Sequence, residues 1–297
     1  MTLMILELQV AKPYDFARSV RDYGWIALAP CRWLDERNAL RRVERLDSGR
    51  IVVLHISGHD VGETVTVRID MQTNSKLTRR EQDEIRRKVH WMLKLDEDLS
   101  DFYQSCRADT ALWEKIGTGR GRLLRSPTLF EDVVKTICTT NTTWSQTKGM
   151  VERIVRFLGE PASGDPELRA FPTPEQVLAG EGLFAGEIRL GYRNDYVLQL
   201  AREVVGKQRD LEALKTSGLP ASEMRRELKR IKGVGDYAAS TLLMSLGYYD
   251  SVAVDTEVRA LVVKKYFNGQ KPSDKEIAAV YDHWGKWKYL AYWFDSA

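Results

Sequence analysis

Residues 228–240 read LKRIKGVGDYAAS, and this stretch connects two predicted helices through a very short turn. Gly233 and Gly235 flank Val234, and glycines allow both a tight turn and a close approach of the backbone to a partner. The helix that follows presents unpaired N–H groups and the positive end of its dipole, which together suit a phosphate group. By itself the pattern fits an ordinary helix–helix turn as well as a DNA-binding hairpin.

A second segment of interest lies shortly after this turn. Residues 251–259 read SVAVDTEVR, so Asp255 closes a short apolar stretch and precedes a predicted helix. Aspartate is a frequent N-cap residue, and capping alone explains its presence at this position. A further role for Asp255 therefore depends on what surrounds it.

The first hundred residues have the patterns of β-strands. Residues 64–70 read TVTVRID, and their alternation places apolar side chains on one face, as in a half-buried antiparallel strand. The β-branched stretch 51–56 follows a turn signal and predicts a neighbouring strand, and residues 6–10 predict a third. Residues 79–95 predict a helix. We therefore expect an α+β domain with an antiparallel sheet over residues 1–98.

Beyond residue 98 the sequence predicts helices almost throughout. Ser126-Pro127 and Thr173-Pro174 each combine a capping side chain with a proline in the first helical turn. Amphipathic helices are further expected over residues 194–207 and 222–231, from Asp255 onward, and over 276–294. We therefore expect an all-α domain over residues 99–297.

Composition narrows the possible classes of protein. The chain has 297 residues, of which 43% are hydrophobic and 29% charged, and its net charge of +3 permits nucleic-acid binding without requiring it. Cys31, Cys106 and Cys138 are too scattered for a disulfide framework or a cysteine-rich zinc or iron–sulfur cluster. No apolar run is long enough to span a membrane, and the start does not resemble a signal peptide. An intracellular protein of the cytoplasm or nucleoid, or of a nucleus, is expected, with no membrane partner.

Taken together, the segments resemble the helix-hairpin-helix DNA glycosylase superfamily. The glycine hairpin and the aspartate after residues 251–254 carry the resemblance. Residues 137–141 (ICTTN), 149–153 (GMVER) and 190–193 (LGYR) look like the 8-oxoguanine DNA glycosylase branch, and residues 285–291 (GKWKYLA) resemble 3-methyladenine DNA glycosylase II. The resemblance implies an α+β protein in which an N-terminal antiparallel β-sheet domain precedes an all-α glycosylase domain.

The resemblance also implies roles for individual residues. Asp255 matches the catalytic acid of the family. An enzyme that extrudes a base must hold a kinked duplex and fill the vacated space. The residues that match this DNA-binding machinery are Gly233, Val234, Gly235 and Asp236 in the hairpin, Asn141 as the residue that fills the gap, and Tyr192 and Arg193 as a wedge pair at the opposite strand.

One departure from the family concerns the nucleophile. The glycosylase/lyase members carry a hairpin lysine that attacks the sugar and forms a Schiff base, and Tyr237 stands at that position here. Lys232 precedes the glycines, where the family usually has proline, and does not replace that lysine. Because a phenol forms no imine, we expect a monofunctional enzyme in which Asp255 stabilises positive charge on the sugar and water attacks C1′.

The C-terminal aromatic residues favour an alkylated purine as the substrate. The resemblance places Trp287 in the base pocket, where it and Tyr237 would form an electron-rich cleft for a cationic base. Core packing at helical spacing is the alternative for the aromatic residues of this segment, which are Trp284, Trp287, Tyr292 and Trp293.

Two substitutions separate the chain from the 8-oxoguanine enzymes. Tyr292 falls where those enzymes read the flipped base with a glutamine, and Gln146 falls where an arginine helps to read the opposite base. Specificity for 8-oxoguanine is therefore not expected. Arg120, Arg122 and Arg125 form a basic loop for which the sequence leaves two alternatives open, phosphate contact or a solvated surface.

Only one bound ion is implied, again by resemblance. Backbone carbonyls of Lys229, Ile231 and Val234 would hold a monovalent cation at the hairpin. No other cofactor is expected, and the iron–sulfur cluster of the endonuclease III branch is excluded because no cysteine follows Cys138.

The sequence thus leads to one hypothesis and two alternatives. The hypothesis is a monomeric, monofunctional DNA glycosylase of base excision repair, which removes a damaged purine, expected to be alkylated, from double-stranded DNA. The alternatives are a bifunctional 8-oxoguanine DNA glycosylase/AP lyase, and a non-catalytic DNA-binding helix-hairpin-helix protein.

Overall fold

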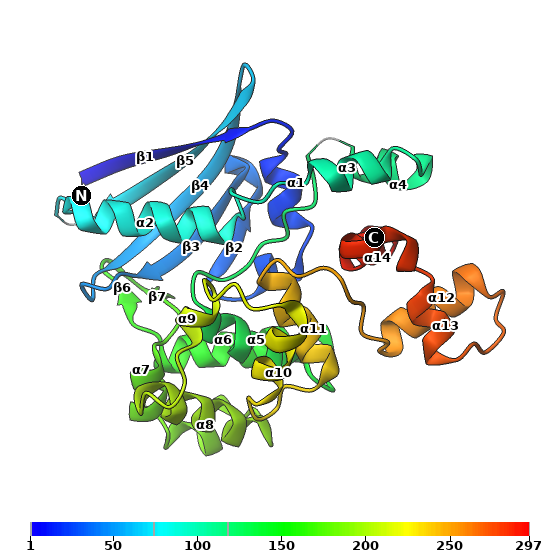
Figure 1. The fold of residues 1–297 in the computed structure, drawn as a ribbon. Helices are drawn as coiled ribbons and strands as arrows, with labels where there is room; N and C mark the ends of the chain where they lie inside the picture. The colour runs from blue at the N-terminus through cyan, green and yellow to red at the C-terminus, as the bar shows by residue number, and fades with distance from the viewer. Residues whose placement is uncertain (1, 74, 118, 297) are drawn as a thin grey trace. The chain divides into compact units, whose positions relative to one another are not determined.

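The computed structural model describes residues 2–73, 75–117 and 119–296. Contacts divide the chain into two compact units, Met1–Glu97 with Thr118–Glu212, and Asp98–Gly117 with Ala213–Ala297. Figure 1 shows an antiparallel sheet in the N-terminal part of the chain and helices through most of the remainder. Each unit is discontinuous in sequence, and the expected division into domains 1–98 and 99–297 stays a prediction.

The first unit contains a five-stranded antiparallel sheet (Figure 1), which confirms the expected α+β class. Its strand order is β1-β5-β4-β3-β2. The strands predicted at 6–10, 51–56 and 64–70 are confirmed, and two more were not predicted. The bounds are β1 Thr2–Ala11, β2 Cys31–Leu34, β3 Ala39–Arg45, β4 Ile51–Val61 and β5 Thr64–Thr73.

The inner face of this sheet forms a hydrophobic core with a helix. Val65, Val67 and Ile69 of β5 are at most 2% exposed, as their alternation predicts. Helix α2, Arg79–Met92, contributes Ile85 and Val89 to the buried side chains and lies along the sheet in Figure 1. The helix begins with a capping box between Thr78 and Glu81. Three short helical turns, α1 Phe16–Arg21, η1 Gly24–Ala27 and η2 Asp35–Arg37, complete the N-terminal part.

The rest of the first unit is mainly helical. Its elements are α5 Leu129–Thr139, α6 Trp144–Leu158, β6 Pro161–Ala162, β7 Asp165–Arg169, α7 Pro174–Ala179, the π-helical turn η3 Phe184–Ile188 and α8 Arg193–Val205, followed by α9 Leu211–Leu214. The β6–β7 hairpin corrects the expectation of an all-α region after residue 98. Its Ala162 and Leu168 pack against Val43 of the sheet, so apolar burial on the outer face of the sheet accounts for it.

One predicted helix start is wrong by two residues. Thr128, not Ser126, caps α5, and its hydroxyl accepts a hydrogen bond from the Glu131 N–H. The backbone N–H of Ser126 instead donates to Asp132 Oδ1 at 3.0 Å. The start predicted at Thr173 is confirmed, with a capping box and Pro174 in the first turn.

The second unit is helical. Its elements are α3 Ser100–Cys106, α4 Thr110–Ile116, α10 Ala221–Lys229, α11 Asp236–Ser245, α12 Thr256–Tyr266, α13 Asp274–Ala279, η4 Asp282–Trp287 and α14 Lys288–Ser296. The single helix expected over 276–294 is interrupted, because Gly285 has a φ of 53°. Within the described ranges, none of the helices combines the length and the apolar composition needed to cross a membrane.

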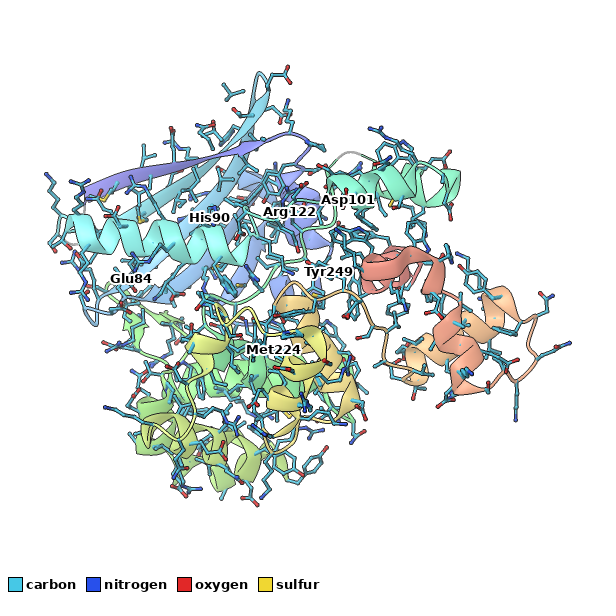
Figure 2. The ribbon with its side chains drawn as sticks, in the orientation of Figure 1. Glu84, His90, Asp101, Arg122, Met224 and Tyr249 are labelled. Carbon is cyan, nitrogen blue, oxygen red and sulfur yellow. The ribbon has the colours of Figure 1, made fainter. Side chains whose placement is uncertain are left out.

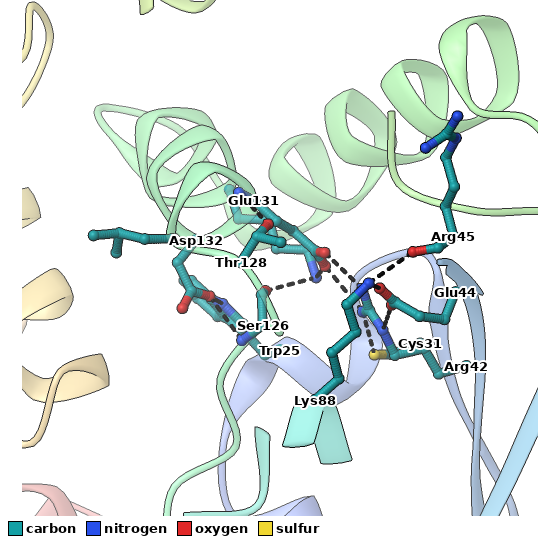
Figure 3. Close-up of polar contacts among 12 residues, drawn as sticks. Trp25, Cys31, Arg42, Glu44, Arg45, Lys88, Ser126, Thr128, Glu131 and Asp132 are labelled. Carbon is teal, nitrogen blue, oxygen red and sulfur yellow. Dashed lines mark hydrogen bonds and ion pairs between the residues drawn. The ribbon is translucent and has the colours of Figure 1, made fainter. Parts of the chain in front are cut away.

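A buried cluster of charges joins the sheet to two helices of the first unit (Figure 3). Arg42 of β3 donates from Nη2 to Glu131 Oε2 of α5 at 2.6 Å and from Nε to Glu44 at 2.7 Å. Lys135 of α5 contacts Glu131 at 2.7 Å, and Lys88 of α2 contacts Glu44 at 3.0 Å. Burial alone would raise the pKa of the Glu131 carboxyl, but Arg42 and Lys135 lower it to about 2.

Replacing Glu131 tests whether this cluster holds the first unit together. Glu131→Gln leaves Arg42 and Lys135 buried without their shared carboxylate, so we expect the free energy of unfolding to fall by about 3–5 kcal/mol. Chemical denaturation at neutral pH measures this change. The matched control is Glu181→Gln, whose ion pair with Arg202 is half exposed, and it should change stability by less than about 1 kcal/mol.

The same pair predicts a pH dependence. Because the pKa of Glu131 is depressed, its stabilisation is present above its ordinary value of 4.5 and is lost as the pH falls towards about 2. The wild-type protein should lose stability more steeply than Glu131→Gln over this interval. Equal slopes and equal stabilities for the two proteins would contradict the proposed importance of the cluster.

Candidate functional site

The glycine hairpin forms a tight turn between two helices, as the sequence predicts. Helix α10 ends at Lys229, and α11 begins at Asp236 with Gly235 as its N-cap. Within the turn, the N–H of Val234 donates to the carbonyl of Ile231 at 3.0 Å. Gly235, Asp236 and the first-turn Tyr237 are exposed, so the N-terminal end of α11 is open to a partner.

The two glycines of the hairpin differ in what the fold requires of them. Gly233 has a φ of 89°, a conformation that other residues adopt only with strain. Gly235 has extended backbone angles, with φ −87° and ψ −166°, and a β-carbon placed on it would meet no atom within 4 Å. The turn itself therefore explains a glycine at position 233 but not one at position 235.

The proposed cation site consists of backbone groups. Ile231 and Val234 have buried side chains, so only their main-chain groups can serve a ligand in the turn. The Lys229 side chain donates to Asp236 Oδ1 at 2.8 Å, which occupies this hairpin carboxylate. These features are compatible with carbonyl ligands, and the cation stays a prediction.

Asp255 caps α12, as the sequence predicts. Its Oδ1 accepts a hydrogen bond from the N–H of Val258 at 2.8 Å. Among the described residues, none donates a hydrogen bond to Oδ2, and the side chain is half-buried. One carboxylate oxygen therefore fixes the orientation of the group, and the other remains available.

An arginine that the sequence analysis missed links the hairpin helices to Asp255. Arg225 of α10 donates from Nη2 to Ser240 Oγ of α11 at 3.1 Å and to Ser251 Oγ at 2.6 Å. Ser251 begins the segment that ends at Asp255. Arg225 lies within an ordinary charged helix pattern, so no sequence signal distinguishes it.

The charge of Asp255 acts on two tyrosines of α14, Tyr289 and Tyr292. Burial is the main cause that raises the pKa of Tyr289 and of Tyr292, and the charge of Asp255 and the nearby Tyr237 contribute in the same direction. Both phenols therefore stay protonated at neutral pH. Tyr292 is thus within electrostatic reach of both Asp255 and Tyr237, although the three residues are far apart in the chain.

Trp287 is buried in an aromatic stack. Its ring lies 5.8 Å from that of Tyr249, which Figure 2 labels, and 5.6 Å from that of Phe102. The backbone N–H of Tyr289 donates to the Tyr249 carbonyl at 2.8 Å. Core packing therefore accounts for the ring, whereas its buried Nε1 has no hydrogen-bond partner among the residues that the structure describes.

Asn141 stands at the tip of the turn between α5 and α6. It follows the C-cap residue Thr140, has a φ of 46° and is exposed. Its Nδ2 lies 3.4 Å from the hydroxyl of Tyr192, which is 49% exposed, and this hydrogen bond lowers the pKa of Tyr192. Two of the residues predicted to contact DNA are therefore brought together at the surface.

Arg193 is a buried anchor of the same turn. It is 7% exposed, and its guanidinium donates to the carbonyls of Thr140 and Asn141 and to that of Leu190. The guanidinium carbon of Arg193 lies 4.5 Å from the centre of the Tyr192 ring. Arg193 thus orients Asn141 and Tyr192 rather than presenting its own side chain at the surface.

Gln146 and Trp144 lie at the start of α6, directly after this turn. Gln146 accepts hydrogen bonds in the capping box of α6, which explains a glutamine there on structural grounds. Trp144 is 41% exposed at the start of the same helix and was not predicted as a site residue.

The structure contradicts both alternatives for the basic loop, which were phosphate contact and a solvated surface. Arg122 and Arg125 are 8% and 5% exposed, and they donate to carbonyls that include those of Glu97 and Trp91. Arg120 forms an ion pair with Asp22 at 2.6 Å. All three arginines therefore hold the loop to the first unit; Figure 2 labels Arg122.

The predicted site residues fall into two groups. Asn141, Tyr192 and Arg193 belong to the first unit, and they contact one another. The hairpin residues, Tyr237, Asp255 and Trp287 belong to the second.

Comparisons with known proteins agree on the fold. No family model matches the chain. The DNA-3-methyladenine glycosylase of Bacillus subtilis is 22% identical over 216 residues, which make up 71% of this chain and 70% of that relative. A 3-methyladenine DNA-glycosylase structure from Archaeoglobus fulgidus matches with a TM-score of 0.75 and 22% identity, over 98% of this chain and 97% of its own.

A second solved structure comes from the other branch of the resemblance. It is the 8-oxoguanine glycosylase/lyase of Clostridium acetobutylicum in complex with double-stranded DNA, with a TM-score of 0.71 and 19% identity over 99% of this chain and 96% of its own. Both neighbours cover the sheet as well as the helices. The chain therefore has the fold of these two DNA glycosylase structures, in agreement with the resemblance seen in its sequence.

Proposed function

We propose that this protein is a DNA glycosylase of base excision repair, which binds duplex DNA and hydrolyses the N-glycosidic bond of a damaged base. The observation that carries the proposal is the second unit itself, where Arg225 connects both hairpin helices to the segment that ends at Asp255. A DNA-binding turn and a carboxylate are thereby held in one framework. The names of the similar proteins support this class of activity.

In the proposed reaction, the damaged nucleotide leaves the base stack and enters the site. The bond between the base nitrogen and C1′ breaks, and its electrons leave with the base. Positive charge develops on the sugar, and the carboxylate of Asp255 stabilises it. Water then adds to C1′ and releases a proton, so the products are the free base and an abasic site.

The proposal includes a monofunctional mechanism. Tyr237 occupies the first turn of α11, where the resemblance implies a lysine in the lyase members, and a phenol forms no Schiff base. Lys229 of the same hairpin is bound to Asp236. Hydrolysis by water is therefore the route that these residues favour.

An alkylated purine is the proposed substrate. Tyr289 and Tyr292 lie within electrostatic reach of Asp255, and aromatic rings with a nearby negative charge favour a cationic base. The names of the Bacillus subtilis and Archaeoglobus fulgidus relatives refer to 3-methyladenine. Two relatives thus point to the same class of base as the aromatic residues.

For the DNA itself, we propose that the exposed Asn141 and Tyr192 enter the duplex and that Arg193 positions them. The same residues resemble the 8-oxoguanine branch, so a bifunctional 8-oxoguanine glycosylase/lyase is the second candidate function. Tyr237 and Tyr292 argue against this second candidate, because the resemblance implies a lysine and a glutamine at these positions in the 8-oxoguanine enzymes.

Replacing Asp255 separates its catalytic role from its capping role. Asparagine caps helices about as well as aspartate but carries no charge, so Asp255→Asn should fold normally and lose activity by about 100-fold or more. End-labelled duplexes with one alkylated purine, hypoxanthine, 8-oxoguanine or uracil measure the activity, with and without hot alkali. Wild-type cleavage should require alkali.

The controls decide between the candidate functions. Duplex binding by Asp255→Asn should equal that of the wild-type protein, and retained turnover would refute the assigned role. Cleavage without alkali, accompanied by covalent trapping with borohydride, would show an imine and so favour the bifunctional enzyme.

The two hairpin glycines provide a test of DNA binding. Gly233→Ala should destabilise the protein by about 1–2 kcal/mol, because alanine is strained at this positive φ. Gly235→Ala should cost less than about 1 kcal/mol but weaken duplex binding by about tenfold, since a methyl group would meet the phosphate. Thermal denaturation and fluorescence anisotropy measure the two effects. Unchanged binding by Gly235→Ala would exclude close backbone contact at this position.

A further inference from the structure

Trp144 is an exposed aromatic residue at the start of α6 that the proposed function does not yet use. Its side chain is 41% exposed, and Thr143, Ser145 and Gln146 beside it in the chain are exposed polar residues. A single exposed apolar side chain is common on protein surfaces and indicates nothing by itself. What distinguishes Trp144 is the way in which the first unit holds its ring.

The ring of Trp144 packs against Gly24, the first residue of η1. A β-carbon placed on Gly24 would lie 2.9 Å from Cη2 and 3.0 Å from Cζ2 of the indole, too close for an ordinary contact. Gly24 does not have a left-handed φ, so its backbone conformation does not call for a glycine. Contact with the indole therefore explains why this position has no side chain.

The segment that contains Gly24 is itself fixed to α5. The next residue, Trp25, is 4% exposed and donates from Nε1 to Asp132 Oδ1 at 2.7 Å (Figure 3). Asp132 belongs to α5, and the turn that carries Asn141 follows the end of this helix. One helix thus fixes both the turn with Asn141 and the support of Trp144.

The exposed part of the indole has no partner within the chain. Among the residues that the structure describes, none accepts a hydrogen bond from Nε1 of Trp144, and no aromatic ring lies against its ring. The indole can therefore contact a partner outside the chain without losing an existing polar or aromatic contact.

Trp144 also lies close to the residues proposed to enter the duplex. It follows Asn141 by three positions, and three residues span at most about 11 Å. Tyr192 contacts Asn141 from the other side of the turn, with 3.4 Å between the hydroxyl and Nδ2. Because successive bases of one strand are about 3.4 Å apart, a residue at this distance from Asn141 is within about three base steps of the gap.

We propose that Trp144 is a stacking platform for DNA, against which a base close to the gap packs when Asn141 enters the duplex. Its indole supplies the aromatic face, and stacking of this kind accepts any of the four bases. The inference rests on the proposed function and extends it, since it adds a DNA-binding residue. It also gives the N-terminal part of the chain a role in DNA binding, because Gly24 supports the ring.

The experiment compares Trp144→Leu with a control, Val205→Ala, in the full chain. Leucine keeps an apolar side chain but cannot stack. Val205 is a 38% exposed apolar residue at the end of α8 remote from Tyr192. Fluorescence anisotropy measures the affinity for a duplex that contains one stable abasic-site analogue, with each of the four bases opposite to it. A second set of duplexes carries 2-aminopurine beside or opposite the abasic site, since the fluorescence of this base reports its stacking.

Trp144→Leu should weaken duplex binding by about tenfold, and by the same factor with each opposite base, because stacking depends little on base identity. Trp144→Phe should keep most of the affinity, and Val205→Ala all of it. The fluorescence of 2-aminopurine at one of the positions should change when the wild-type protein or Val205→Ala binds, but not when Trp144→Leu binds. Equal affinities of Trp144→Leu and the wild-type protein would overturn the proposal.

Gly24→Ala tests the support without changing the ring itself. Its methyl group would displace the indole, so duplex binding should weaken by about fivefold. In a protein that already carries Trp144→Ala, the same change should have no effect on binding, because no ring is left to displace. Thermal denaturation checks that each variant is folded. Additive losses in the double variant would contradict support of Trp144 by Gly24.

The measurements also separate this inference from the proposed function. If the wild-type protein binds the duplex and excises no lesion, but Trp144→Leu binds weakly, the proposed activity fails and the platform stands. If the wild-type protein excises a lesion and Trp144→Leu binds and excises equally well, the platform fails alone. A wild-type protein that binds no duplex would refute both.

Discussion

The architecture of the first unit depends on one buried ion pair, between Arg42 of the sheet and Glu131 of α5. Each side chain is 2% exposed, so neither charge is tolerable in the interior without the other. Because the distance between partners must be short, the pair fixes α5 against β3. Lys88 extends the cluster to α2 by bonding Glu44. The turn that bears Asn141 begins where α5 ends, so the position of this exposed residue follows from charges at the other end of the helix.

The second unit is organised by hydrogen bonds to side chains that converge from several helices. Arg225 joins α10, α11 and the segment before Asp255. At the C-terminal end, Asp295 accepts hydrogen bonds from Tyr266 and Tyr281, each at 2.8 Å, and thereby connects α14 to the end of α12 and to the residue before η4. These contacts leave the start of α11 and one oxygen of Asp255 available. A rigid frame with a few exposed polar groups is suited to binding and hydrolysis, because the frame need not reorganise during the reaction.

Arginine side chains on the two faces of the sheet have different surroundings. Arg42 points inward and is matched by carboxylates, whereas its neighbour Arg41 lies on the outer face, where it lines a pocket together with Glu160 and Asp165. Adjacent residues of a strand face opposite sides, so one dipeptide supplies a fully buried charge to one face and a partly exposed charge to the other. Arg122 and Arg193 resemble Arg42 in being buried. Both belong to basic segments of the sequence, yet both are buried and bind backbone carbonyls.

The sequence by itself determined the regular elements that follow a simple period, the hairpin and the family resemblance. Strands β1, β4 and β5 follow apolar alternation, and Thr173 and Asp255 are recognisable caps because capping is local. Strand β3 escaped prediction, since buried Arg42 and Glu44 occupy positions where apolar residues are expected. Only the tertiary structure decided which arginines are anchors and that Arg225 binds Ser251, at the start of the segment that ends at Asp255. Burial and pairing depend on residues distant in the chain, so the local pattern of a charged side chain does not reveal whether it faces solvent, a carboxylate or an open pocket.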